Sequence, residues 1–215
     1  PRLLRALVTT IEISVVALFL GTFIGLVMGV IRTSGPKILR LIISGYVTFV
    51  RGTPIMIHIY AAYFLLPKIG LVLPAFWVGL VAMTFNTVGY QIEIIRAAIE
   101  SIDRGQVEAA ISIGMTKWMA MRWVIMPQVA RRIIPPLTNE LSSLVKASSI
   151  LSVIAVLELT KVANAIIASS YKFAEVYILV SILYFAIIQI LISGTTWLEN
   201  NVFNHMKDTS ETSQR

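Results

Sequence analysis

The sequence contains no cysteine, which excludes a disulfide framework, a thiolate metal site and a cysteine nucleophile. Charged residues are scarce: they make up 13% of the 215 residues, whereas 57% are hydrophobic. Because a soluble domain carries about 25% charged residues, this composition indicates an integral membrane protein. Histidine occurs only twice, as His58 and His205, which lie too far apart in the sequence to predict a zinc site.

A phosphate-binding loop is also missing. Such a loop places glycines and a Gly-Lys pair, followed by Ser or Thr, at the start of a helix, and none of the 12 glycines precedes a lysine. We therefore expect no ATP hydrolysis by this chain, no enzymatic activity and no cofactor of its own. The net charge of +7 reports orientation in a membrane protein rather than nucleic-acid binding, so no nucleic-acid partner is expected.

Long apolar runs are what the sequence has in abundance. A helix needs about 20 residues to cross a hydrocarbon core of about 30 Å, and the absence of ten-residue alternation favours a helical bundle over a barrel. We predict an all-α integral membrane fold with five transmembrane helices, at residues 7–31, 39–66, 75–99, 132–158 and 174–203. They form one transmembrane domain, 1–204, followed by a polar cytoplasmic tail, 205–215.

Breaker residues separate these helices, and one breaker lies inside the second helix. Arg51-Gly52-Thr53-Pro54 should interrupt it, because proline lacks an amide donor and disfavours the helical conformation in the residue before it. Two alternatives remain open: an interfacial helix at 38–50 joined by a loop to a short crossing at 54–66, or one kinked helix. The fourth connection is predicted as a loop from Lys161 to Lys172.

Lysine and arginine are distributed unequally between the two sides of the predicted bundle. The first and third connections with the tail hold eleven: Arg32, Lys37, Arg40, Arg96, Arg104, Lys117, Arg122, Arg131, Arg132, Lys207 and Arg215. The second and fourth connections with the start of the chain hold five: Arg2, Arg5, Lys68, Lys161 and Lys172. The positive-inside rule places the first group in the cytoplasm, so the N-terminus is expected outside and the C-terminus inside. The run at 7–31 is too long for a signal peptide and is predicted to be retained.

A polar insert at 105–127, GQVEAAISIGMTKWMAMRWVIMP, separates the third and fourth helices. Val107, Ile111, Met115 and Trp118 recur at helical spacing, which predicts a short amphipathic helix. Spacing alone leaves two alternatives open: a docking site for a partner, or a helix lying at the lipid interface.

Polar and ionisable side chains inside a membrane are costly and commonly face a cavity or a partner. Asn86, Tyr90 and Glu93 lie on one face of the third helix at spacings of four and three, so they are candidates for a polar path. The alternative for Glu93 is an ion pair with Arg96 that only fixes helix packing. His58 is predicted to be a packing or pore-lining residue near the break.

The fourth helix contains a second set of candidates. Lys146, Ser148 and Ser149 interrupt an apolar stretch, and Glu158 follows it. Serine can bond to the backbone and loosen a helix, and unwound backbone at membrane depth is tolerated where it lines a cavity. There the ammonium of a zwitterion could meet Glu93 or Glu158, and its carboxylate could meet Lys146 or exposed backbone amides. The alternative is that the small residues permit close helix packing across a dimer.

Within the insert, Glu108-Ala109-Ala110, then Gly114, then Met126-Pro127, resemble the EAA loop of ATP-binding-cassette (ABC) importer permeases. Further matches occur in the expected order between about residues 51 and 160. They are Arg51-Gly52-Thr53-Pro54, Tyr90 to Arg96, Ile102 to Gln106, Arg131 to Asn139, Lys146 to Ile150 and Leu157-Glu158-Leu159. The chain is thus similar to permeases of the polar amino acid uptake family (His/Glu/Gln/Arg/cystine type). It departs from the pattern at Gln91 and Ala147, which are expected near the translocation path.

The resemblance implies a type I ABC importer permease in the bacterial cytoplasmic (inner) membrane, in contact with lipid. It implies a coupling helix at about 105–120, with contacts through Gly105, Glu108, Ala109, Ala110, Gly114 and Pro127. The implied partners are two ATPase subunits that bind ATP and magnesium, a second permease copy or a homologous permease, and an external amino-acid-binding protein. Asn86, Tyr90, Glu93, Lys146, Ser148, Ser149 and Glu158 are the expected substrate-path residues.

Two other functions remain alternatives. Intramembrane Glu93 and Glu158 could carry protons in a gradient-driven transporter, although no internal repeat of the kind common in such transporters is evident. The chain could also be a non-transporting membrane anchor whose insert holds a soluble partner.

Overall fold

A computed structural model describes residues 2–203 of the chain. The polar tail predicted at 205–215, with His205, Lys207 and Arg215, lies outside these residues. Every regular element in the described range is helical, so the all-α prediction is confirmed. The elements are α1 (Arg2–Ser34), α2 (Lys37–Gly52), α3 (Ile55–Leu65), η1 (Pro67–Ile69), α4 (Ala75–Glu100), α5 (Arg104–Ser112), α6 (Lys117–Ala120), η2 (Met121–Ile125), α7 (Met126–Arg132), α8 (Ile134–Ala147), η3 (Ser148–Ile154), α9 (Leu159–Ser170) and α10 (Phe173–Phe203).

Helices α1 and α4 form the centre of the bundle and pack together through glycines of α1. Gly21, Gly25 and Gly29 recur every four residues and are buried. A Cβ atom added at Gly25 would lie 2.5 Å from the Cβ atom of Gln91 on α4, so the two backbones approach as closely as small residues allow. This places Gln91, which is fully buried, in the α1–α4 interface.

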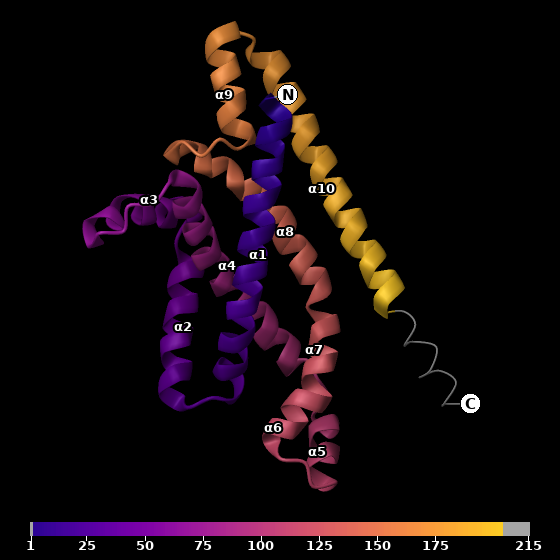
Figure 1. The fold of residues 1–215 in the computed structure, drawn as a ribbon. Coiled ribbons are helices and arrows are strands. Elements are labelled where there is room, and N and C mark those ends of the chain that lie inside the picture. Colours follow the sequence, from indigo (N-terminus) through magenta and orange to yellow (C-terminus); the bar gives the residue numbers. More distant parts are fainter. Residues whose placement is uncertain (1, 204–215) are drawn as a thin grey trace.

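The second predicted helix is two helices. Helix α2 ends at Gly52, Thr53 is extended, and α3 starts at Ile55 after Pro54. The two axes meet at 106°, and α3 leaves the bundle sideways (Figure 1). The prediction of a single kinked helix at 39–66 is therefore wrong, because Thr53 is not helical and the helix axis turns by 106° at this break.

The fourth predicted helix and the loop after it also differ from the structure. Helix α8 ends at Ala147, a 3₁₀ helix follows to Ile154, and Ala155 is left-handed with φ 64°. The segment from Lys161 to Lys172, predicted as a loop, is mostly helix α9, which is inclined by 52° to the preceding helix. A continuous helix at 132–158 is thus wrong. The α-helix changes to a 3₁₀ helix at Ser148, whose hydroxyl donates to the carbonyl oxygen of Val145 at 2.8 Å.

The insert is a folded-back unit rather than one helix over 105–120. Helix α5 ends at Ser112, and Gly114 turns the chain with φ 90°. The short α6, one π-helical segment and α7 follow. Buried Ile102, Met121 and Ile125 pack with Ile95 of α4, so hydrophobic contacts fix the insert to the end of the bundle.

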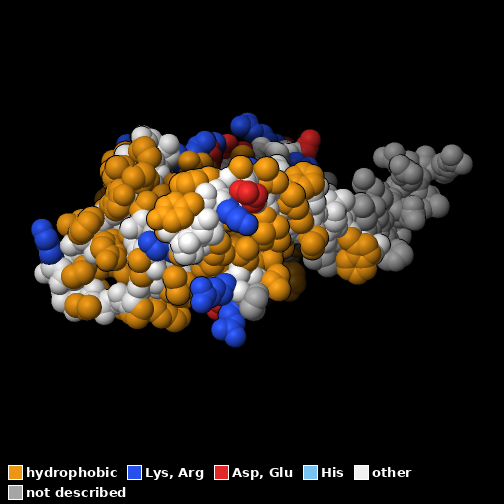
Figure 2. Space-filling view, turned by 90° about the horizontal axis from the view of Figure 1, so that it is seen from above, with side chains coloured by type: hydrophobic (Ala, Val, Ile, Leu, Met, Phe, Trp, Pro, Cys, Tyr) orange, Lys and Arg blue, Asp and Glu red, His pale blue; other side chains and the backbone are white. Residues whose placement is uncertain are grey.

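Within residues 2–203, three single helices, α1, α4 and α10, are long and apolar enough to cross a membrane, and there are up to five spans if each bent pair counts as one. The count of five therefore stays a prediction. The N-terminus and α9 lie at one end of the bundle, and the α1–α2 turn lies at the other end with α5 and α6 (Figure 1). Seen from the end that holds the N-terminus and α9, the surface is mainly hydrophobic with scattered charges (Figure 2).

Candidate functional site

An open cavity of about 540 Å³ lies beside the break between α2 and α3. Helix α4 contributes residues close to its middle, and α8 contributes residues of its last two turns. The lining residues are Arg51, Gly52, Thr53, Pro54, Ile55, Asn86, Tyr90, Glu140, Ser143, Leu144 and Ala147. The cavity therefore exists because one helix breaks and another ends at the same depth of the bundle. Its volume falls in the range of small-molecule sites.

One cation and one carboxylate line this cavity. Arg51 is the next-to-last residue of α2, and its guanidinium lies 5.8 Å from the ring centroid of Tyr90. Glu140 lies on α8 one turn before Ser143, and within residues 2–203 its side chain makes no hydrogen bond or ion pair. A ligand with both a negative and a positive group would find a partner for each here.

His58 fixes the polar groups at the break. Its Nε2 lies 2.6 Å from the hydroxyl of Thr53, and its Nδ1 lies 3.1 Å from the amide nitrogen of Asn86. The imidazole is buried and thus ties the α2–α3 connection to the middle of α4. His58 thus packs near the cavity and holds two of its lining residues, Thr53 and Asn86. This position agrees with the prediction of a packing or pore-lining residue near the break.

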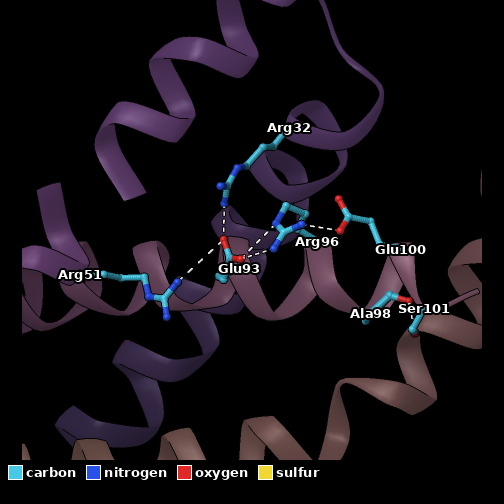
Figure 3. A network of polar contacts seen from close by, with 7 residues as sticks. All are labelled: Arg32, Arg51, Glu93, Arg96, Ala98, Glu100 and Ser101. Atoms are coloured by element: carbon cyan, nitrogen blue, oxygen red, sulfur yellow. Dashed lines mark hydrogen bonds and ion pairs between the residues drawn. The ribbon is translucent and has the colours of Figure 1, made fainter. Parts of the chain in front are cut away.

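Glu93 lies one turn beyond Tyr90 but belongs to an ion cluster rather than to the cavity lining (Figure 3). Its carboxylate binds Arg32 of α1 and Arg96 of α4, with the Arg96 Nε at 3.1 Å. Arg51 approaches the same carboxylate at 4.0 Å, and Arg96 also binds Glu100. The cluster therefore joins α1, α2 and α4, and Arg51 links it to the cavity.

The structure brings only two of the expected path residues into the cavity, Asn86 and Tyr90. Lys146 is exposed and does not line it. The hydroxyls of Ser148 and Ser149 donate to carbonyl oxygens three residues earlier.

Glu158 lies elsewhere and is fully buried at the start of α9. It accepts the amide protons of Thr160 at 2.8 Å and Lys161 at 2.6 Å, and the hydroxyl of Tyr184 donates to it at 3.0 Å. Its carboxylate therefore caps a helix, and its role in a path stays a prediction.

Two charged cavity residues were missed as site residues by sequence reasoning. Glu140 satisfies the rule applied to Glu93, an ionisable residue inside a predicted helix, and its spacing to Ser143 and Ala147 puts the three on one face. Arg51 was noted only as part of the Arg51-Gly52-Thr53-Pro54 motif and was not predicted to line a site. Of the two departures expected near the translocation path, Ala147 lines the cavity, whereas Gln91 does not.

The expected coupling residues form a second surface, at the far end of the bundle. The Gly105 amide donates to the Asp103 carboxylate, with 2.6 Å between nitrogen and oxygen. Asp103 thereby caps the start of α5. Glu108 and Ala109 are exposed, whereas Ala110 is buried and Gly114 forms the turn. Pro127 is exposed in the first turn of α7.

The insert is tied to its neighbours, and its apolar side chains remain exposed. Gln128 of α7 donates to the side-chain oxygen of Gln106 on α5 at 3.1 Å. Ile113, Trp118 and Trp123 are each more than 60% exposed. A patch of this kind suits a protein or lipid contact, so both alternatives for the insert fit its geometry.

Comparison with known proteins gives a consistent result. A family model described as binding-protein-dependent transport system inner membrane component matches residues 2–204. The probable amino-acid ABC transporter permease protein YckA of Bacillus subtilis is 38% identical over 190 residues, covering 88% of this chain and 84% of that protein. The arginine transport system permease protein ArtQ of the same organism is 33% identical, covering 89% and 88%.

Solved structures agree with the sequence comparison. The fold is similar to a chain in the crystal structure of an amino acid ABC transporter with histidines, with a TM-score of 0.86, 36% identity, and coverage of 93% of this chain and 94% of that chain. A chain of the inward-facing methionine ABC transporter MetNI has a TM-score of 0.80 at 21% identity, with 94% and 96% covered. The second likeness concerns the fold alone.

Proposed function

The chain belongs to the family of binding-protein-dependent transport system inner membrane components, and on this premise we propose that it is the membrane subunit of an ATP-driven importer of a polar amino acid. Family membership identifies it as a multi-pass permease subunit of an ABC transporter in the inner membrane. ATP and magnesium would be bound by partner ATPase subunits, since this chain has no phosphate-binding loop.

The observation that carries the substrate proposal is the presence of Arg51 and Glu140 in one cavity. An amino acid has a carboxylate and an ammonium group, and a charge-assisted bond to each is stronger than a bond between neutral groups. Arg51 would bind the carboxylate, and Glu140 would bind the ammonium group. Asn86, Tyr90 and Ser143 would offer hydrogen bonds to a polar side chain.

The insert would be the contact for the ATPase subunits. Glu108 and Ala109 are exposed on α5, and the Gly114 turn presents Ile113 beside them. Because the insert packs on the end of α4, a push on α5 would be transmitted to the helix that carries Asn86 and Tyr90. A second permease copy or a homologous permease would complete the pathway, and an external binding protein would deliver substrate at the opposite end.

The proposal predicts strict ATP dependence. The chain, its cognate ATPase subunits and the binding protein, reconstituted together in proteoliposomes, should take up radiolabelled amino acid only when ATP is present on the ATPase side. Uptake driven by a proton gradient without ATP would instead identify a gradient-driven transporter. A complex that assembles but moves no amino acid under either condition would identify a membrane anchor.

Two glycines provide a matched pair of variants for the same assay. Gly114 and Gly70 both have positive φ, 90° and 85°, and neither has a neighbour within 4 Å of an added Cβ atom. Gly114→Leu and Gly70→Leu thus impose a similar backbone strain of about 1–2 kcal/mol, but only the first distorts the insert. Gly114→Leu should abolish ATP-coupled uptake, and Gly70→Leu should keep most of it. Equal uptake by the two variants would contradict coupling through this turn.

A further inference from the structure

A second cavity, of about 340 Å³, lies where α1 turns into α2. Its lining comes from the end of α1, the first two turns of α2 and the last two turns of α4. The lining residues are Arg32, Lys37, Arg40, Leu41, Ser44 and Arg96. Four of the six are cations, so the cavity concentrates positive charge contributed by three helices.

Carboxylates neutralise only part of this charge. Arg32 and Arg96 bind Glu93, and Arg96 also binds Glu100 (Figure 3). Lys37 and Arg40 are exposed, and in the part of the chain that the structure describes neither side chain has a hydrogen-bond or ion-pair partner. Lys37 and Arg40 thus remain without a counter-charge, whereas the neighbouring Arg32 and Arg96 are paired with carboxylates.

The start of α2 adds to the positive potential. Its N-cap residue, Pro36, makes no side-chain cap, and the first turn contains no acidic residue. Amide protons at the start of a helix need acceptors, and the helix dipole makes this end positive. Lys37 and Arg40 in the first turn are therefore placed where cations are disfavoured unless an anion is present.

Apolar side chains lie directly beside these cations. Ile38, Leu41 and Ile42 are 74%, 75% and 62% exposed, and they belong to the same first turns of α2. Because α1 and α4, both long enough to span a membrane, end close to the cavity, its depth corresponds to the headgroup level. A molecule with an anionic head and apolar chains would satisfy both kinds of surface.

We propose that this cavity binds the phosphate of an anionic phospholipid. Lys37 and Arg40 hold the phosphate together with the free amides at the start of α2, and Arg32 and Arg96 form the rear wall. The acyl chains lie along Ile38, Leu41 and Ile42. Clusters of basic residues between helices at a membrane surface recognise acidic lipid headgroups in this way, and each lysine or arginine strengthens binding by about 1 kcal/mol. An acidic protein segment would match the charges but would leave the apolar side chains uncovered.

The test uses the purified full chain in neutral detergent micelles. Tetraoleoyl cardiolipin, dioleoyl phosphatidylcholine or inorganic phosphate is added, the thermal unfolding midpoint is measured, and retained lipid is counted by native mass spectrometry. Cardiolipin should raise the midpoint and remain bound at low micromolar concentration. Phosphatidylcholine and inorganic phosphate should do neither.

A double variant and a matched control locate the site. Lys37→Gln with Arg40→Gln should weaken cardiolipin binding about thirtyfold, on the basis of about 1 kcal/mol for each charge. The control, Arg104→Gln with Lys117→Gln, removes the same charge from exposed positions at the same end of the bundle but outside the cavity, and it should bind as the unmodified chain does. Since neither Lys37 nor Arg40 has an internal partner, the double variant should fold.

The conservative pair Lys37→Arg with Arg40→Lys keeps both charges and should retain binding. Three results would overturn the proposal: an equal shift with phosphatidylcholine, a full shift with inorganic phosphate alone, or unchanged cardiolipin retention in the glutamine double variant. None of these results bears on the proposed transport function, because the assay contains neither substrate nor ATPase.

Discussion

Two glutamates, Glu93 of α4 and Glu140 of α8, have opposite surroundings, and this difference indicates different roles. Glu93 lies among Arg32, Arg51 and Arg96, so its charge is already compensated inside the protein. Glu140 has no such partner in residues 2–203 and lines the main cavity, so its charge is available to a ligand. We expect Glu93 to hold the bundle together and Glu140 to bind substrate.

Neutral substitutions separate the two roles. Glu140→Gln should raise the KM for uptake about ten- to a hundredfold, since a charge-assisted hydrogen bond contributes about 1.5–3 kcal/mol, while membrane abundance and thermal stability stay unchanged. Glu93→Gln leaves half-buried arginines without a partner and should cost about 1–3 kcal/mol of stability, less than a fully buried pair because water still reaches the cluster. Uptake kinetics and thermal unfolding of the purified protein measure both effects.

Glu100→Gln serves as the control for the cluster. Among the described residues the Glu100 side chain binds Arg96 alone, and it is 56% exposed, so its loss should change stability little. If Glu93→Gln altered the KM at normal stability, Glu93 would belong to the substrate path rather than to the packing of α1, α2 and α4.

At this scale the sequence predicted some residues and could not predict others. The spacing of Asn86 and Tyr90 identified two cavity residues, and the rule for ionisable residues applied equally to Glu140. By contrast, the capping role of Glu158 depends on a helix that starts at Leu159, which the apolar pattern concealed. The contact between Arg32 and Glu93 joins positions 61 residues apart, and no local pattern indicates such a pair.

At the scale of elements, the sequence predicted the straight helices and the break at Pro54, but it missed the end of α8 and the helix α9. Helices α4 and α10 start and end within a few residues of the predicted bounds, because each is long, mostly apolar and free of internal proline. The direction of α3 and the end of α8 depend on neighbours that periodicity does not reveal. Pro54 signals a break, but the packing around His58 and Asn86 sets its angle.

The glycines of α1 were also missed, and they give a test of helix packing. Gly25→Ala would put its Cβ atom 2.5 Å from the Cβ atom of Gln91 and 3.3 Å from the Gln91 backbone, so α1 and α4 must separate. Overpacking of this kind costs about 1–3 kcal/mol. Thermal unfolding of the purified chain should therefore show a clearly lower midpoint, together with less folded protein in the membrane.

Gly45→Ala provides the comparison, because Gly45 also lies inside a helix but has nothing within 4 Å of an added Cβ atom. Alanine has the higher helix propensity, by about 1 kcal/mol, so this variant should be neutral or slightly stabilised. A stabilised Gly25→Ala protein would mean that α1 and α4 do not approach as closely as the structure indicates.

On the scale of the whole molecule, the three proposed sites lie at two different depths. The main cavity lies beside the middle of α4, and the basic cavity lies at the α1–α2 turn. The insert is at the same end of the bundle as that turn (Figure 1). Of the eleven cations assigned to the cytoplasmic side, Lys207 and Arg215 fall outside the described residues, which leaves nine. The sequence therefore predicts that the insert end faces the cytoplasm, where ATP is available.

The absence of cysteine makes this orientation directly measurable, because a single introduced cysteine is the only thiol in the chain. Ser34 is the last residue of α1, next to the α1–α2 turn, and Lys172 lies between α9 and α10; both are exposed. These two connections lie at opposite ends of the bundle (Figure 1). A membrane-impermeant maleimide added to intact spheroplasts should label Lys172→Cys and should reach Ser34→Cys only after permeabilisation. Labelling of Ser34→Cys alone in intact spheroplasts would reverse the orientation, and the insert would then lie on the side without ATP. Both variants must react fully after denaturation, which controls for thiol reactivity. The expected pattern follows from the clustering of cations at one end, since short basic segments are retained in the cytoplasm.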